Sequence, residues 1–209
     1  MSRLKNPWET PIPAMFMETI DTEALDRQDM ERLAAGSDSA LDALMERHAG
    51  PVFQFLFRML DDEEDANDLA QETFVRIYRH RDRYDGGKFT TWLYTIAGNL
   101  ARNEYRRRSR HPNVSFQGET EPNGGSLSDV LPSGDPGPAA SIQDEERHHA
   151  VRAAVQKLPD DLKEALILCE WEELSAAEAA AVLNTTARGI ESRLYRARKL
   201  LKERLKRWV

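Results

Sequence analysis

The chain has 209 residues, of which 40% are hydrophobic and 31% charged, a composition typical of a soluble protein with one large or two small domains. Its single cysteine, Cys169, excludes a disulfide framework and a cysteine-based metal site. Because no apolar run reaches the ~20 residues that span a bilayer and the N-terminus lacks a signal-peptide core, we expect a cytoplasmic protein without membrane insertion.

Charge is unevenly distributed along the chain, although the net charge is −7. Residues 1–80 carry 8 Lys and Arg against 17 Asp and Glu, whereas residues 92–110 carry 5 against 1 and residues 186–209 carry 9 against 2. Two basic segments on an acidic body predict two contacts with DNA and a separate surface for a basic protein partner.

Residues 1–28 contain prolines and no sustained period, so we expect a disordered N-terminal tail. The first folded domain is expected over residues 29–110. Within it, Leu41–Leu60 has helical periodicity, and Gly50-Pro51 marks a kink or a break.

A second helix is expected over Asp65–Arg79, after the acidic run Asp61–Asp65. Acidic residues at this position favour a helix N-terminus through the helix dipole. The helix also presents a polar face that suits a basic protein partner. This face comprises Asp68, Gln71, Glu72 and Val75.

The segment Tyr84–Arg110 is the most informative part of the chain. It begins as an aromatic loop around Gly86-Gly87, in which Tyr84, Phe89 and Trp92 offer stacking surfaces for unpaired bases. The helix that follows has an apolar stripe and, on the opposite face, the polar set Asn99, Arg102, Asn103 and Arg106. Amides and arginines beside an aromatic loop predict a nucleic-acid contact. Two alternatives stay open: an ordinary amphipathic helix with a solvated face, and a core position for Trp92.

Prolines and glycines concentrate between Pro112 and Pro138, so residues 111–141 are expected to form a flexible linker. A second helical domain follows over residues 142–209. Pro159 marks a helix start, and Ser175 with Glu178 fits a capping box.

The segment Ser175–Arg198 has the proportions of a helix-turn-helix: a short alanine-rich helix, a turn at Asn184-Thr185-Thr186, and a long basic helix. The start of the second helix would lie in the major groove, while later arginines would reach phosphates. The alternative is an ordinary helical hairpin with a basic face. That face carries Arg188, Ser192, Arg193, Arg196 and Lys199.

The sequence predicts an all-α fold with two small helical domains, because strand-like alternation is absent. It also indicates that the protein is not an enzyme and takes no cofactor. No nucleophile–base pair, phosphate loop or carboxylate dyad is present, and His148-His149 point apart on a helix, which disfavours a metal site.

Two stretches in this order, DANDLAQETFVRIYRHRDRYDGGKFTTWLYTIAGNLARNEYRRR and LPDDLKEALILCEWEELSAAEAAAVLNTTARGIESRLYRARKLL, resemble bacterial sigma factors of the extracytoplasmic-function (ECF) group, in the sigma-70 family. The resemblance covers about Asp29–Arg110 and Ile142–Leu205. It implies a promoter-specificity subunit that binds core RNA polymerase, recognises the −35 and −10 promoter elements, melts the −10 region and initiates transcription.

The N-terminal block is similar to sigma region 2. The resemblance implies that the Asp65–Arg79 helix binds the clamp coiled coil of the largest polymerase subunit, while the loop captures a flipped base and the next helix holds the melted strand. The implied polymerase contacts are Asp65, Asp68, Leu69, Gln71, Glu72 and Val75. The implied −10 contacts are Tyr84, Lys88, Phe89, Trp92, Asn99, Arg102, Asn103, Arg106 and Arg107.

The C-terminal block resembles sigma region 4, whose second helix reads the −35 element as duplex and whose domain binds the polymerase flap. The implied −35 contacts are Arg188, Glu191, Ser192, Arg193, Arg196 and Lys199. Glu191 and Gly189 depart from the family's usual residues. Glu191 cannot hold a phosphate but can accept from a cytosine amino group, so the −35 sequence cannot be copied from relatives. Regulation by an anti-sigma protein is implied by the family alone.

Two other classes of protein remain as alternatives. One is a free-standing helix-turn-helix regulator that binds duplex DNA without polymerase. The other is an interaction protein that keeps the acidic helix and needs neither basic face.

Overall fold

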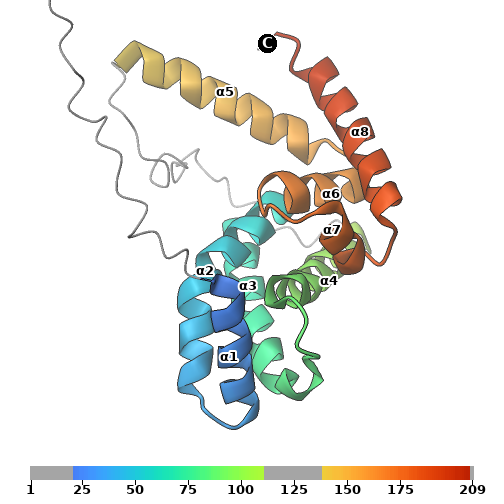
Figure 1. The fold of residues 1–209 in the computed structure, drawn as a ribbon. Coiled ribbons are helices and arrows are strands. Elements are labelled where there is room, and N and C mark those ends of the chain that lie inside the picture. Colours follow the sequence, from blue (N-terminus) through green and yellow to red (C-terminus); the bar gives the residue numbers. More distant parts are fainter. Residues whose placement is uncertain (1–20, 111–137, 208–209) are drawn as a thin grey trace, which may run out of the picture.

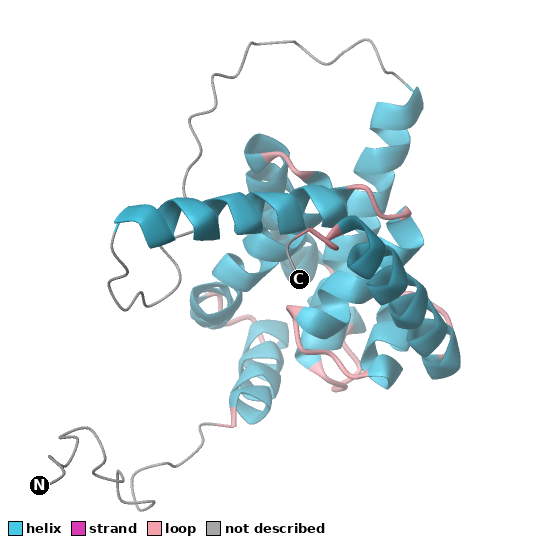
Figure 2. Ribbon diagram, turned by 90° about the horizontal axis from the view of Figure 1, so that it is seen from above, coloured by secondary structure: helices cyan, strands magenta, loops and turns pink. Residues whose placement is uncertain are grey.

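The computed structural model describes residues 21–110 and 138–207, and in these residues the chain is built from helices joined by loops, with no strand (Figure 2). The N-terminal group contains α1 (Thr22–Ala34), α2 (Ser39–Leu60), α3 (Glu63–Arg79), the short 3-10 turn Arg81–Arg83 and α4 (Phe89–Arg110). The C-terminal group contains α5 (Pro138–Gln156), α6 (Asp160–Glu170), α7 (Ala176–Val182) and α8 (Ala187–Arg204). The all-α prediction is confirmed.

The four N-terminal helices pack around one apolar core. On α2, buried residues recur at helical spacing, as at Val52, Phe55 and Met59, and they meet Ile77 of α3 and Leu93 of α4. In the C-terminal group, α6, α7 and α8 contact one another, while α5 contacts α8 near its C-terminal end and its other end extends outward (Figure 1).

The first helix begins earlier than the sequence predicted. The expected tail ended at residue 28, yet α1 begins at Thr22, where Asp21 caps the helix by accepting a hydrogen bond from Ala24 N at 3.1 Å. Polar residues hide this helix in the sequence, because its inward-facing side chains include the buried carboxylates Asp26 and Asp29. Residues 1–20 lie outside the described part of the chain.

Three other boundaries also differ from expectation. Helix α2 runs unbroken through Pro51, so the break considered at Gly50-Pro51 is absent. Helix α3 begins two residues early, because Asp62 caps it by accepting from Asp65 N at 2.9 Å. Helix α5 begins at Pro138, inside the segment expected as linker, and residues 111–137 fall outside the described ranges.

The two helical groups contact each other. Helix α7 lies against α4, and α6 lies against the end of α2 (Figure 1). None of the described helices combines the length and the apolarity needed to cross a membrane.

Candidate nucleic-acid and polymerase interfaces

The loop before α4 is closed by its own residues. Gly86 has a φ of +80°, which glycine adopts without strain. Asp85 Oδ1 accepts a hydrogen bond from Gly87 N at 3.0 Å, and the Tyr84 hydroxyl donates to the Gly87 carbonyl. These bonds fix the position of Lys88 at the start of α4.

The loop aromatics form a cluster with two faces. The ring centroid of Tyr84 lies 5.4 Å from that of Trp92 and 6.3 Å from that of Phe89. On the inner side, the ring of His48 from α2 lies 5.1 Å from Phe89. Tyr84 and Trp92 are half-buried, so each has a packed edge and a solvent-facing edge. Trp92 thus belongs partly to the core and partly to the surface.

Phe89 does not fit its expected role as a base-stacking residue, because it is 1% exposed. The physical reason is that α4 begins at Phe89 rather than at Trp92, so the loop is shorter than expected. Phe89, Leu93 and Ala97 are then four residues apart, and all three face the core. This spacing was visible in the sequence and identifies Phe89 as part of the apolar stripe.

The opposite face of α4 carries amide–arginine pairs. Arg102 Nη2 donates to Asn99 Oδ1 at 2.7 Å, and Arg106 Nη1 donates to Asn103 Oδ1 at 3.3 Å. Asn99, Asn103 and Arg106 are exposed, as the spacing predicted. Amides and guanidinium groups held side by side on a surface can bind base edges and phosphates together.

Arg107, next to this face, has an acidic neighbour. The hydrogen bond from Arg107, which is exposed, lowers the pKa of the Glu104 carboxyl. Arg107 Nη2 lies 2.6 Å from Glu104 Oε1, so the Arg107 side chain is held close to the helix surface.

Two cations of the candidate −10 site are paired with the C-terminal group. Arg102 donates to Glu164 of α6, and Lys88 Nζ lies 2.6 Å from Glu178 Oε1 of α7. In this structure, therefore, Arg102 and Lys88 are each paired with a carboxylate of the C-terminal group, at positions where DNA phosphates would be expected to bind.

The acidic helix α3 is divided between free and paired residues. Asp68, Gln71 and Val75 are exposed, and Val75 retains 40% of its surface. Leu69 is half-buried against the core. Asp65 instead accepts a hydrogen bond from Arg108 of α4.

Glu72, the remaining member of the expected polymerase face, is paired on its own helix, where it accepts from Arg76 at 2.8 Å. The exposed face of α3 therefore centres on Asp68, Gln71 and Val75.

The helix-turn-helix has the local chemistry that the sequence predicted. Ser175 and Glu178 form the capping box of α7, and Thr186 caps α8 by accepting from Gly189 N at 3.1 Å. A Cβ at Gly189 would lie 2.9 Å from Thr185 Oγ1. Gly189 was expected only to weaken the helix, but it also gives the turn room.

The outward face of α8 is accessible. Five of the six expected −35 residues are exposed, whereas Arg193 is half-buried with its Nε 3.7 Å from Asp161 Oδ2. The exposed residues are Arg188, Glu191, Ser192, Arg196 and Lys199.

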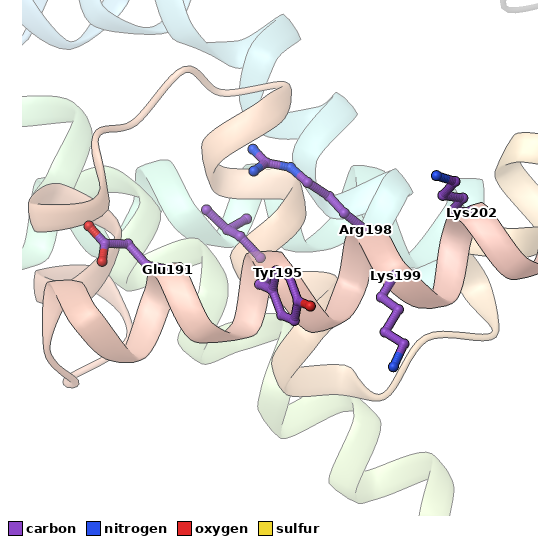
Figure 3. A pocket seen from close by; sticks show the side chains of 6 residues that line it. Glu191, Tyr195, Arg198, Lys199 and Lys202 are labelled. Atoms are coloured by element: carbon purple, nitrogen blue, oxygen red, sulfur yellow. The ribbon is translucent and has the colours of Figure 1, made fainter.

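One residue of this face was missed in the sequence. Tyr195 is 71% exposed, more than any other large hydrophobic side chain in the described residues. It lines a shallow groove along α8 with Glu191 and Lys199 (Figure 3). Its spacing, four residues from each of them, could have placed it on the reading face.

A metal site finds no support in residues 21–110 and 138–207, where no group of His, Cys, Asp and Glu side chains could hold an ion. The side chain of His148 lies outside the description, and His149 is exposed.

Comparison with known families assigns both helical groups. The family described as Sigma-70 region 2 matches residues 44–111, and the family described as Sigma-70, region 4 matches residues 148–201. The region 2 match disfavours a helix-turn-helix regulator whose N-terminal domain only oligomerises or senses a signal.

Curated relatives carry the same assignment. The RNA polymerase sigma-H factor of Pseudomonas aeruginosa is 31% identical over 88% of this chain and 95% of that protein. The ECF RNA polymerase sigma-E factor of Escherichia coli is 31% identical over 82% of this chain and 90% of that one. The ECF RNA polymerase sigma factor SigE of Mycolicibacterium smegmatis is 33% identical over 82% of this chain, which spans 65% of that longer protein.

Solved structures share the fold. CnrH, in complex with the cytosolic domain of CnrY, superposes with a TM-score of 0.64 at 26% identity over 87% of this chain and 97% of CnrH. The sigma factor RpoE of Bartonella quintana has a TM-score of 0.58 at 23% identity over 79% of this chain and 96% of that one. The chain therefore belongs to the extracytoplasmic-function group of the sigma-70 family, the promoter-specificity subunits of RNA polymerase.

Proposed function

We propose that the chain divides promoter recognition between α4 and α8. Helix α4 and its loop hold the melted −10 strand, and α8 reads the −35 element as duplex in the major groove. The observation that carries the proposal is that each of the two domains exposes one helix face made of base-reading residue types. On α4 these are Asn99, Asn103 and Arg106, and on α8 they are Arg188, Ser192 and Arg196.

Capture of the −10 strand fits the geometry of the loop. Tyr84 and Trp92 have solvent-facing edges beside the cationic face, and a base that leaves the duplex can stack there. Unstacking a base costs a few kcal/mol, and stacking contributes about 1–3 kcal/mol per base, so phosphate contacts must supply the rest. The chain thus opens DNA by binding and carries out no covalent chemistry.

Polymerase binding is proposed for the exposed face of α3. Asp68 and Gln71 offer acidic and polar groups to a basic partner, and the exposed Val75 adds an apolar contact beside them. Asp65 and Glu72 contribute less directly, because each already accepts from an arginine of this chain. Because its proposed partner is RNA polymerase, we propose that the protein acts in the cytoplasm.

A protein inhibitor is proposed as a further partner. CnrH, which shares the fold at 26% identity, was solved in complex with the cytosolic domain of CnrY. Together with the family assignment, this favours an anti-sigma protein for the present chain. Affinity purification from the native host, with polymerase subunits and any inhibitor identified by mass spectrometry, tests both partners.

In vitro transcription with core polymerase across a promoter library tests the main proposal. A variant with Asn99→Ala, Asn103→Ala and Arg106→Ala should still bind core polymerase but lose promoter opening, measured by permanganate reactivity of unpaired thymines. Gln28→Ala is the matched control, because it removes an exposed amide from α1, outside every proposed interface. Unchanged opening by the triple variant would contradict the assignment of α4.

A further inference from the structure

Three carboxylates of the C-terminal domain face cations of the N-terminal domain across one interface. Glu164 pairs with Arg102, and Glu178 pairs with Lys88. Glu172 Oε1 lies 3.2 Å from Arg58 Nη1, and its Oε2 accepts a hydrogen bond from the Tyr94 hydroxyl at 2.5 Å. The side chains of Glu164 and Glu172 are 7% and 5% exposed, so the contact between the domains buries them.

Gly98 leaves room for the paired side-chain ends of Glu164 and Arg102. It lies in the middle of α4, where glycine costs about 1 kcal/mol relative to alanine. A Cβ at this position would lie 2.9 Å from Glu164 Oε1 and 3.3 Å from Arg102 Nη1. A side chain here would stabilise the helix by itself but would meet the docked domain.

A buried lysine also connects the domains, and here the C-terminal domain supplies the cation and the N-terminal domain supplies the acceptors. Lys163 is 2% exposed, and its Nζ lies 3.2 Å from the Met59 carbonyl near the end of α2. It also donates to the Tyr105 hydroxyl of α4. A buried ammonium group needs such partners, so these bonds favour one specific docked arrangement over a loose contact.

The docked arrangement cannot read both promoter elements at once. The −35 and −10 elements are about 25 base pairs apart, which is about 85 Å at ~3.4 Å per base pair. In the structure α7 contacts α4 directly. A chain as long as residues 111–137 can span up to about 90 Å, so its length permits separation of the domains.

We propose that the free chain holds itself in a closed, inactive conformation, in which Glu164 and Glu178 occupy Arg102 and Lys88 in place of DNA phosphates. The C-terminal domain thus acts as an inhibitor of the −10 site in cis. Polymerase binding must separate the domains before promoter DNA can enter. This inference rests on the proposed function of α4, but closure itself can be measured without DNA.

Fluorescence energy transfer in the full chain measures closure. Dyes are attached to Arg83→Cys, five residues before Lys88, and Ala181→Cys, three residues after Glu178, both exposed and close to the contact, in a Cys169→Ala background. We expect high transfer in the otherwise unchanged chain and low transfer with Gly98→Leu, which adds bulk at the interface without changing charge. Gln28→Leu, at an exposed position of α1, is the matched control and should keep transfer high. Equal transfer in Gly98→Leu and the control would overturn the proposal.

A charge swap at the part-exposed pair of Lys88 and Glu178 gives a second test, with Glu178→Lys alone as the control for its loss from the α7 capping box. Lys88→Glu places a like charge against Glu178 and should lower transfer. The double variant Lys88→Glu with Glu178→Lys should restore it, which a purely structural defect would not do. Failure of Lys88→Glu to lower transfer, or of the swap to restore it, would contradict the role given to this pair.

Masking of the −10 site is read by fluorescence anisotropy with a fluorescein-labelled, random-sequence single-stranded 12-mer. Gly98→Leu should bind it at least fivefold more tightly than the unchanged chain, and Gln28→Leu should not. Equal affinities would overturn masking. If energy transfer shows closure while the triple alanine variant of α4 opens promoters normally, the proposed function of α4 fails and closure stands.

Discussion

Asp26→Ala should destabilise the N-terminal domain strongly, although the sequence predicted that this residue lies in a disordered tail. Asp26 is 1% exposed, and its carboxylate is shared by two side chains of α2. Arg47 Nε donates to Oδ1 at 2.9 Å, and His48 Nε2 lies 2.8 Å from Oδ2. Removal of the carboxylate leaves both α2 groups without their shared partner.

The magnitude follows from these contacts. Breaking a buried ion pair from one side costs about 3–5 kcal/mol, because the other charge stays buried. Here Arg47 keeps a second carboxylate, Asp29 Oδ2 at 2.6 Å, and its side chain is 25% exposed. The cost should therefore lie near the lower limit, about 3 kcal/mol.

Urea denaturation followed by far-UV circular dichroism measures this loss. Glu23→Ala is the control, since Glu23 sits on the same helix in an exposed pair with Arg27 at 3.7 Å. Such a pair contributes about 0.3–0.5 kcal/mol, so the two variants should differ clearly. The same midpoint for both would refute the conclusion that α1 is part of the domain. Because His48 packs on Phe89, Asp26→Ala should also loosen the loop and slow promoter opening in permanganate assays.

Three further outcomes are expected. Ser175→Ala removes the α7 capping box and should lower stability by about 1 kcal/mol, measured by thermal unfolding of the full chain. Asp68→Arg reverses an exposed charge on α3 and should weaken core polymerase binding at least tenfold in a pull-down titration, without changing closure. Glu164 lies among Arg102 of α4, Arg193 of α8 and Asp160 of α6, and burial raises its pKa to about 7. Burial also raises the pKa of Glu172. A raised pKa means that docking binds protons, so energy transfer should be highest near pH 5 and fall as the pH rises to about 7, and Glu164→Gln should flatten this dependence.

Local signals in the sequence were sufficient for most of the fold. Apolar spacing placed the helix ending at Arg79, and the Ser175–Glu178 capping box placed α7, because both are set by neighbours along the chain. The polar face of α4 followed from the spacing of Asn99, Asn103 and Arg106 for the same reason.

Ion pairs between side chains that are distant in the sequence could not be predicted in this way. Asp26 looked like a surface residue because its partner Arg47 is far along the chain, in another helix. The pairing of Arg102 with Glu164 crosses 62 positions, and nothing local to either residue indicates it. The sequence likewise does not show that a Cβ at Gly98 would meet the ends of the paired Glu164 and Arg102 side chains.

The chemistry of the domain interface suits a contact that must open. An interface closed by large apolar side chains would gain about 25 cal/mol for each Å² of apolar surface removed from water and would be difficult to separate. Here apolar side chains of both domains join one buried cluster, but Glu164 and Glu172 are buried beside them, and burial raises the pKa of both carboxyls, so each ionised group lowers the stability of the docked state near neutral pH. Their arginine partners recover only part of that cost. Closure is therefore specific but shallow, and the binding energy of polymerase on α3 and on the C-terminal domain can exceed it.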